Sequence, residues 1–162
     1  MMEIFKRIHA ATPAKLLMVG DGPERPIAED LARQFGIEAD VRFLGKQEQM
    51  EDILAVSDLF LLPSEYESFG LVALEAMAAS TVVISSNAGG LCEINIDGKT
   101  GYTANVGDIE TMSTKAIALL KDEAKLKAFK HNALEQAKRF DIHNIIPIYE
   151  ELYSKFCRKE KN

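Results

Sequence analysis

The sequence has no stretch of apolar residues long enough to cross a lipid bilayer, and it does not open with the charged-then-apolar pattern of an export signal. It also lacks a basic excess, since 19 Lys and Arg residues stand against 25 Asp and Glu residues and the formal net charge is -6. Nucleic-acid-binding proteins usually gather Lys and Arg on one face. We therefore expect neither a membrane span nor a nucleic-acid partner.

Cysteine and histidine are scarce. The two cysteines, Cys92 and Cys157, lie far apart and show no metal-ligand spacing. We expect no metal site, and we expect both thiols to be reduced, in a cytoplasm. The three histidines, His9, His131 and His143, are scattered along the chain, and a lone histidine on a helix is usually a surface or cap residue.

Short apolar runs alternate with segments of helical periodicity. Strands are predicted at 15–19, 41–44, 58–62 and 81–85, with a short extended segment at 100–104. Helices are predicted at 2–10, 27–35, 50–56 and 70–79, and from 108 onward with breaks near Asp122 and near Phe140. Pro147 is expected either to kink or to restart the last helix. The 162 residues suffice for one domain. The pattern predicts an α/β domain of Rossmann-like type, with a parallel sheet covered by helices on both faces.

Ligands of such sheets bind outside the carboxyl ends of the strands, so the loops that follow the strands are the candidate site. The first loop holds Gly20, Asp21, Gly22 and Pro23, and a later one holds Leu44, Gly45 and Lys46. A dinucleotide fingerprint would need a third glycine where Arg25 stands, which makes a nicotinamide or flavin site improbable. The first loop is otherwise an ordinary strand-to-helix turn, and Lys46 faces either a phosphate or, more often in such a position, solvent.

The third loop, residues 63–70, is the most informative segment. Glu67 lies in the loop and Glu75 falls eight residues later, inside the helix predicted to start near Gly70. Free N–H groups of Gly70, Leu71 and Val72 at the helix N-terminus would attract a phosphate, and Glu75 could accept hydrogen bonds from ribose hydroxyls. On these residues alone, a second interpretation is equally good: Ser64, Glu65, Glu67 and Ser68 simply cap the helix.

Other residues have simpler expectations. Phe60, Leu74 and Met77 have the spacing of core residues. Gly89 and Gly90 either let the backbone pass a ligand or form a tight turn, and the sequence does not separate these two roles.

The segment 64–77, SEYESFGLVALEAM, resembles the family-4 retaining glycosyltransferases of the GT-B fold, whose signature is two glutamates separated by seven residues. Glu67 and Glu75 have this spacing. The segments 19–24, 43–47 and 89–93 also recur in the family, in the same order, so the resemblance covers nearly the whole chain.

The resemblance implies that residues 1–162 form the domain that binds the donor nucleotide sugar, and that the N-terminal acceptor domain is absent from this chain. The co-substrate would be a UDP-sugar, with UDP-N-acetylglucosamine as donor and an acceptor such as L-malate, and no other cofactor. The implied catalytic residue, close to the anomeric carbon, is Glu67. The implied donor and nucleotide contacts are Gly20, Asp21, Gly22, Pro23, Leu44, Gly45, Lys46, Ser68, Phe69, Gly70, Leu71, Val72 and Glu75.

The start of the chain departs from the family. Relatives have a further strand there, followed by a loop with an Arg and a Lys that neutralise the diphosphate, whereas Lys6 and Arg7 lie inside a predicted helix. The absent strand would lie in the middle of the sheet. We therefore expect the strands at 15–19 and 58–62 either to pair directly or to borrow a strand from a neighbour, which would make a homo-oligomer. The alternative function is a truncated, non-catalytic module that binds nucleotide sugars.

Overall fold

The computed structural model describes residues 1–157, which form an α/β fold. The strands are β1 (Leu16–Val19), β2 (Val41–Gly45), β3 (Leu59–Leu62), β4 (Val82–Ser86) and β5 (Gly101–Ala104). The helices are α1 (Met2–Ala11), α2 (Arg25–Gln34), η1 (Glu38–Asp40), α3 (Met50–Ala55), α4 (Leu71–Ala78), α5 (Leu91–Ile94), α6 (Ile109–Leu120), α7 (Glu123–Lys138) and α8 (Ile142–Cys157). The short helices η1 and α5 are the elements that the periodicity did not predict.

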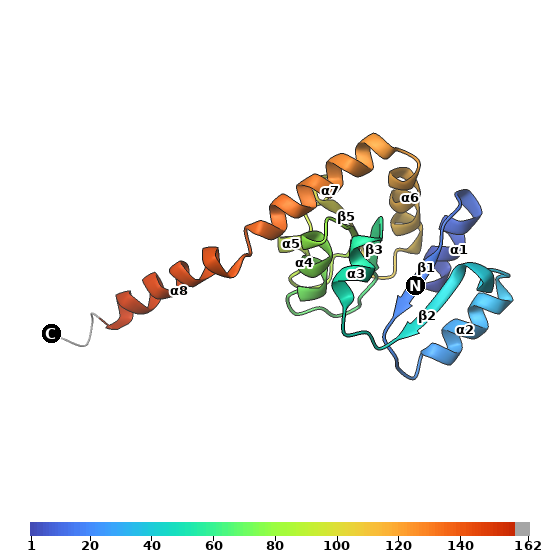
Figure 1. The fold of residues 1–162 in the computed structure, drawn as a ribbon, viewed down its shortest axis with the longest axis horizontal. Coiled ribbons are helices and arrows are strands. Elements are labelled where there is room, and N and C mark those ends of the chain that lie inside the picture. The colour runs from blue at the N-terminus through green and yellow to red at the C-terminus, as the bar shows by residue number, and fades with distance from the viewer. Residues whose placement is uncertain (158–162) are drawn as a thin grey trace.

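All strand pairs are parallel, which confirms the predicted fold class, but the sheet is in two parts. One part is the pair β1–β2 and the other is β3–β4–β5 (Figure 1). Within the described residues, β1 and β3 share no ladder of hydrogen bonds. The expectation that these two strands pair directly is therefore wrong for this chain.

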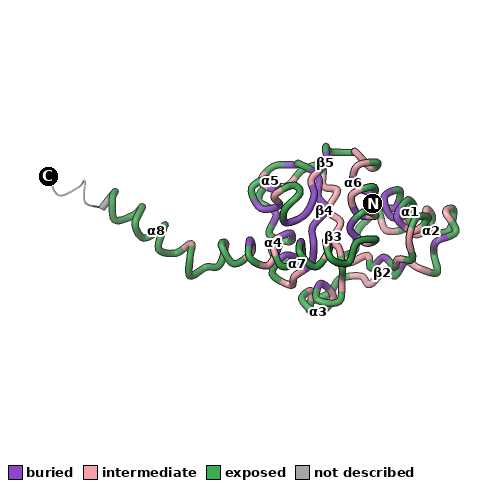
Figure 2. The backbone as a smooth tube through the Cα atoms, turned by 90° about the horizontal axis from the view of Figure 1, so that it is seen from above, coloured by how far each residue is buried: buried purple, intermediate pink, exposed green. Residues whose placement is uncertain are grey.

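The strand β4 is the centre of the larger part. Its five residues are all buried (Figure 2). The apolar ones alternate between two hydrophobic clusters. Val82 and Ile84 pack with α1 and α6, whereas Val83 packs on the opposite face with α4 and Leu54 of α3. Helices therefore cover both faces of the sheet, as predicted. Met77 is fully buried, with Phe60 and Leu74 packed beside it, which confirms these three core residues.

The helix α1 joins the two parts of the sheet. Its residues Ile4 and Ile8 belong to the cluster around β4, β5 and α6, whereas Met2 and Phe5 belong to a cluster with β1, β2 and α2. Two polar residues of α1 also contact the part of the protein that contains β1 and β2. Lys6 Nζ lies 4.0 Å from the centre of the Phe35 ring, and His9 Nε2 lies 3.0 Å from Asp40 Oδ2.

The C-terminal helices break near Asp122 and near Phe140, as the sequence predicted, but not at Pro147. The N-caps of α6 and α7 are Asp108 and Asp122, whose carboxylates accept the N–H groups of Thr111 and Lys125. The helix α8 runs through Pro147 without a break, so the expected restart at this residue does not occur. It extends away from the body of the protein, with most of its surface exposed (Figures 1 and 2).

No helix in the described part of the chain is both long enough and apolar enough to cross a membrane.

Replacing Ile4 with Ala should test the role of α1. Ile4 is 1% exposed and reaches the core shared by α1, β4 and α6, so the substitution leaves a cavity at the joint between the two parts. We expect a loss of about 2–5 kcal/mol in the free energy of unfolding, measured by urea denaturation. The control Val56→Ala removes an apolar side chain that is 77% exposed and should change this free energy by less than about 0.5 kcal/mol. Equal effects of the two substitutions would contradict the assignment.

Candidate functional site

The loop between β3 and α4 brings Glu67 back onto the start of the helix. The N-cap of α4 is Gly70, and its N–H donates to Glu67 Oε1 at 3.1 Å. The expectation that the Gly70 N–H is free for a phosphate is therefore wrong, because a carboxylate of the same loop occupies it. The alternative interpretation of Ser64, Glu65, Glu67 and Ser68 as helix caps is wrong, because α4 has no side-chain cap hydrogen bond; Glu67 instead accepts the N–H of the N-cap residue itself. The helix itself begins at Leu71, which leaves the N–H groups of Leu71 and Val72 as the first donors of α4.

Position 70 requires glycine, because of its backbone conformation and because of its close neighbours. Its φ is +91°, in the left-handed region that favours glycine. A Cβ atom at this position would lie 2.7 Å from Leu91 Cδ2 and 3.4 Å from Ile94 Cδ1, both fully buried residues of α5. The missing side chain therefore lets α5 approach the start of α4, in addition to leaving the helix terminus uncovered.

Several predicted site residues meet at one cavity. A cavity of about 1010 Å³ opens between the two parts of the sheet, and at the carboxyl ends of the strands it is lined by Gly20, Lys46, Val72 and Glu75. Lys46 and Glu75 are both exposed. Glu75 is the fifth residue of α4, so its carboxylate lies about one turn beyond the free N–H groups at the helix start. The positive end of a helix, a lysine and a carboxylate thus face one space.

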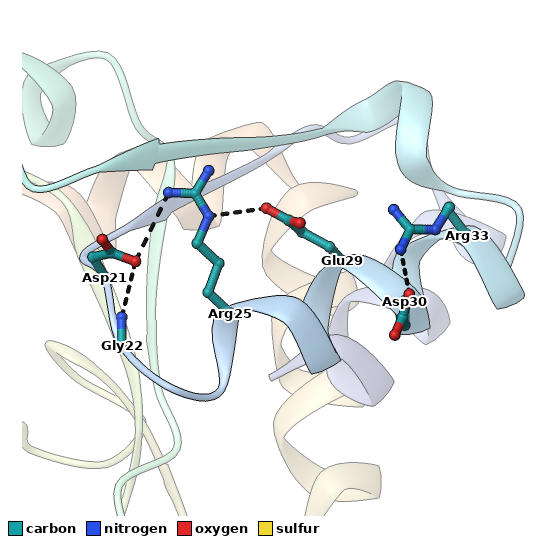
Figure 3. Close-up of polar contacts among 6 residues, drawn as sticks. All are labelled: Asp21, Gly22, Arg25, Glu29, Asp30 and Arg33. Atoms are coloured by element: carbon teal, nitrogen blue, oxygen red, sulfur yellow. Dashed lines mark hydrogen bonds and ion pairs between the residues drawn. The ribbon is translucent and has the colours of Figure 1, made fainter.

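A backbone hydrogen bond connects the loop after β1 to the end of β2. The N–H of Gly20 donates to the carbonyl oxygen of Gly45 at 2.8 Å, which joins the start of the segment 20–23 to the segment 44–46. The carboxylate of Asp21 accepts the N–H of Gly22 at 3.0 Å and thereby closes the turn (Figure 3).

Arg25 is a charged residue at this edge of the sheet, and the sequence did not predict it as part of the site. Its Nε donates to Glu29 Oε1 at 2.9 Å, and its Nη1 lies 3.9 Å from Asp21 Oδ1 (Figure 3). The hydrogen bond with Glu29 raises the pKa of Arg25 above its ordinary value, so the cation is retained. The guanidinium lies 5.9 Å from the centre of the Phe43 ring. Its position two residues after the Gly-x-Gly-Pro turn is the feature of the sequence that could have predicted a charged residue here.

Phe69 and Ser68 contact other parts of the protein instead of lining the cavity. The Phe69 ring makes an edge contact with Phe140 at the end of α7, with 6.2 Å between ring centres, although Phe69 remains 41% exposed. The backbone of Ser68 faces Gly90. Ten of the predicted site residues do not line the cavity that Glu75 lines: Asp21, Gly22, Pro23, Leu44, Gly45, Glu67, Ser68, Phe69, Gly70 and Leu71.

The pair Gly89 and Gly90 supports the loop that holds Glu67. A Cβ atom on Gly89 would lie 1.7 Å from the carbonyl oxygen of Glu67, and one on Gly90 would lie 2.9 Å from that of Ser68. The two glycines therefore permit close contact between two backbone segments of the protein itself. The sequence left their role open, because a contact between residues so far apart has no signature in local periodicity.

Within residues 1–157, no group of three or more His, Cys, Asp or Glu side chains is arranged to hold a metal ion. The three histidines do not line the cavity beside Glu75. Lys6 points toward the ring of Phe35, so it does not supply a cation to this cavity.

A comparison with known families decides the classification. The family described as "Glycosyl transferases group 1" matches residues 1–136. The chain belongs to this family. The glutamate pair and the three glycine-containing loops therefore lie in a group 1 glycosyl transferase domain, as the resemblance implied.

Curated relatives are longer than this chain. N-acetyl-alpha-D-glucosaminyl L-malate synthase from Bacillus anthracis is 43% identical over 162 residues, which are 99% of this chain and 42% of that protein. The sulfoquinovosyl transferase of Arabidopsis thaliana is 34% identical over 86% of this chain and 28% of its own length. The chain thus spans less than half the length of these relatives.

Solved structures agree with the fold. Sucrose-phosphate synthase from Thermosynechococcus elongatus superposes with a TM-score of 0.84 at 29% identity, over 98% of this chain and 42% of that chain. Anabaena HepE in complex with UDP superposes with a TM-score of 0.85 at 27% identity, over 94% of this chain and 44% of that chain. These structures are GT-B glycosyltransferases, which confirms the predicted fold class.

The contact between Gly89 and Glu67 can be tested by substitution. Gly89→Ala places a Cβ atom in the Glu67 carbonyl and also forces alanine into a positive φ of +50°. The control Gly98→Ala has a comparable φ of +71° but open space around its Cβ, so it measures the backbone strain alone. We expect Gly89→Ala to destabilise the protein by about 1–3 kcal/mol more than the control in thermal unfolding. A smaller loss than in Gly98→Ala would contradict this packing.

Proposed function

We propose that this chain is the donor-binding domain of a retaining glycosyltransferase and that it binds a UDP-sugar at the carboxyl edge of its sheet. The observation that carries the proposal is the meeting of Glu75, Lys46 and the N-terminus of α4 at one cavity. A diphosphate is stabilised by free helix N–H groups and by a cation, and a carboxylate can accept hydrogen bonds from two ribose hydroxyls.

The proposed roles follow the order of the loops. The diphosphate contacts the N–H groups of Leu71 and Val72, and Glu75 binds the ribose. The uracil lies against the two hydrogen-bonded segments that follow β1 and β2, which contain Gly20, Asp21, Gly22, Pro23, Leu44, Gly45 and Lys46. The donor sugar lies beside Glu67, Ser68, Phe69 and Gly70, with Glu67 as the catalytic residue close to the anomeric carbon. Since the Glu67 carboxylate holds the Gly70 N–H, its position is fixed relative to the start of α4.

The proposed donor is UDP-N-acetylglucosamine and the proposed acceptor is L-malate. The support is the identity of 43% with N-acetyl-alpha-D-glucosaminyl L-malate synthase over nearly the whole chain, together with HepE, whose solved complex contains UDP. The acceptor would be held by an N-terminal domain that this chain does not span. No further cofactor is proposed, because the UDP leaving group is part of the co-substrate.

A second candidate is a non-catalytic module that binds nucleotide sugars without transferring them. It is favoured by the small number of cations near the site. Lys46 lines the cavity at the carboxyl ends of the strands, and the nearby Arg25 is already paired with Asp21 and Glu29. Cleavage of a sugar phosphate develops negative charge on the diphosphate, which positioned cations stabilise. Turnover of UDP-N-acetylglucosamine with L-malate by this chain, without any added domain, would exclude the second candidate.

Calorimetric titration with UDP tests the nucleotide site. Glu75→Ala removes the charged acceptor of the ribose hydroxyls, and the loss of even one such hydrogen bond costs about 1.5–3 kcal/mol, so we expect UDP binding to weaken about tenfold or more. The matched control is Glu135→Ala, which removes an exposed glutamate from the interior of α7 and does not touch the cavity. It should bind UDP like the unaltered protein. The ribose assignment fails if Glu75→Ala binds UDP unchanged, or if both variants lose affinity equally.

A further inference from the structure

The helix α2 begins with a cation, which is unfavourable at that end of a helix. Arg25 is its first residue, and the first turn of α2 contains no acidic residue. The N-terminus of a helix carries a partial positive charge, so it favours aspartate or glutamate and disfavours arginine. The helix also has no side-chain cap hydrogen bond. A residue that breaks the local rule for a helix start is expected to have a compensating role elsewhere in the structure.

The guanidinium of Arg25 lies among three elements. Its Nε donates to Glu29 Oε1 of α2 itself at 2.9 Å, and its Nη1 lies 3.9 Å from Asp21 Oδ1 in the turn before the helix (Figure 3). The ring of Phe43 in β2 has its centre 5.9 Å from the guanidinium. A Cβ atom on Gly45 would lie 3.7 Å from Nη1, so the cation is beside the end of β2. The same side chain thus connects a helix, a turn and a strand end.

The end of β2 is irregular and needs contacts outside the ladder of hydrogen bonds. Phe43 lies opposite Met18 of β1, whereas the next residue of β1 lies opposite Gly45, so Leu44 is an extra residue in β2. Such a bulge bends its strand, and bulges are frequent beside binding sites. The carbonyl oxygen of Leu44 accepts Nε2 of Gln47 at 2.6 Å. The position of this segment therefore depends on side chains as well as on strand pairing.

The turn after β1 is organised by Asp21. Its Oδ1 accepts the N–H of Gly22 at 3.0 Å, and this same oxygen is the one that faces Arg25. The N–H of Arg25 in turn donates to the carbonyl oxygen of Gly22 at 3.1 Å. Since the N–H of Gly20 bonds to the Gly45 carbonyl oxygen, a shift of Asp21 would disturb the connection between the two segments.

We propose that Arg25 is a positioning residue, whose guanidinium holds the Asp21 turn against the end of β2 and thereby shapes the surface that receives the nucleobase. The inference rests on the proposed function, which assigns the uracil to segments 20–23 and 44–46. Arg25 does not line the cavity, so it acts through Asp21 rather than on the ligand. Its charge also offsets the Asp21 carboxylate, which reduces the repulsion between this turn and an anionic nucleotide.

Stability separates a positioning role from a merely structural one. The side chains of Arg25, Asp21 and Glu29 are 36%, 54% and 35% exposed. Ion pairs as exposed as these contribute little to folding, so loss of the guanidinium should lower the midpoint of thermal unfolding by no more than about 2–4 °C. A loss of nucleotide affinity in a protein of nearly unchanged stability would therefore reflect the shape of the site.

The helix α2 offers a matched control for Arg25→Ala. Arg33 lies on the same helix and pairs with Asp30, away from the turn (Figure 3). In calorimetric titration we expect Arg25→Ala to weaken UDP binding about three- to fivefold, the range that a partly exposed ion pair supports. Arg33→Ala should bind UDP like the unaltered protein. Inorganic diphosphate should bind both variants equally, because its proposed contacts are at the start of α4.

A double variant tests whether Arg25 acts through Asp21. Asp21→Ala should weaken UDP binding about as much as Arg25→Ala does, and the two substitutions together should be no worse than either alone, because both break one network. Amide hydrogen exchange gives a readout without any ligand. The Gly20 N–H should exchange at least about threefold faster in Arg25→Ala than in Arg33→Ala, since the turn is less firmly held.

Unchanged UDP affinity in Arg25→Ala would overturn the inference, as would an equal loss in Arg33→Ala, a parallel loss of diphosphate binding, or additive effects in the double variant. Should Arg25→Ala not fold, Arg25→Lys keeps the charge without the planar set of donors, and it should still lose UDP affinity. If the unaltered protein does not bind UDP, the proposed function fails. Exchange of the Gly20 N–H then decides separately whether Arg25 holds the turn.

Discussion

The packing of α1 against both parts of the sheet holds this fold together. No ladder of hydrogen bonds connects β1 to β3 in the described residues, so the two parts are fixed largely by side chains. Met2 and Phe5 bind α1 to the β1–β2 part, and Ile4 and Ile8 bind it to the part centred on β4. The candidate site depends on this joint, because Gly20 and Lys46 belong to one part and Val72 and Glu75 to the other.

The chemistry of the site arises from backbone geometry as much as from side chains. The left-handed conformation of Gly70 starts α4 and lets the Glu67 carboxylate return to the Gly70 N–H. Gly89 lies under the same loop and fixes the position of the Glu67 backbone. One carboxylate of the signature pair is therefore held rigidly beside the helix start, while the other, Glu75, is exposed to the cavity where a ligand can reach it.

Periodicity and turn residues were sufficient to predict the elements. Apolar runs located all five strands within a residue or two, and Asp108 and Asp122 marked the starts of α6 and α7. The spacing of Glu67 and Glu75 located the candidate site because both residues belong to one short segment. What failed were interactions between distant residues or within irregular backbone: the Glu67–Gly70 hydrogen bond, the contact of Gly89 with Glu67, and the separation of β1 from β3. Each depends on the path of a loop or the packing of a helix, which local patterns do not encode.

The division of the sheet also has a consequence for how the molecule folds and opens. The segment β1–α2–β2 and the segment from β3 to β5 are each built from strands that are close in sequence, so each can form with short loop closure. We therefore expect the chain to contain two local folding units, with α1 packed across both. Within the described residues, partial opening at this boundary would break no strand-to-strand hydrogen bonds, so the side-chain packing of α1 is what opposes it.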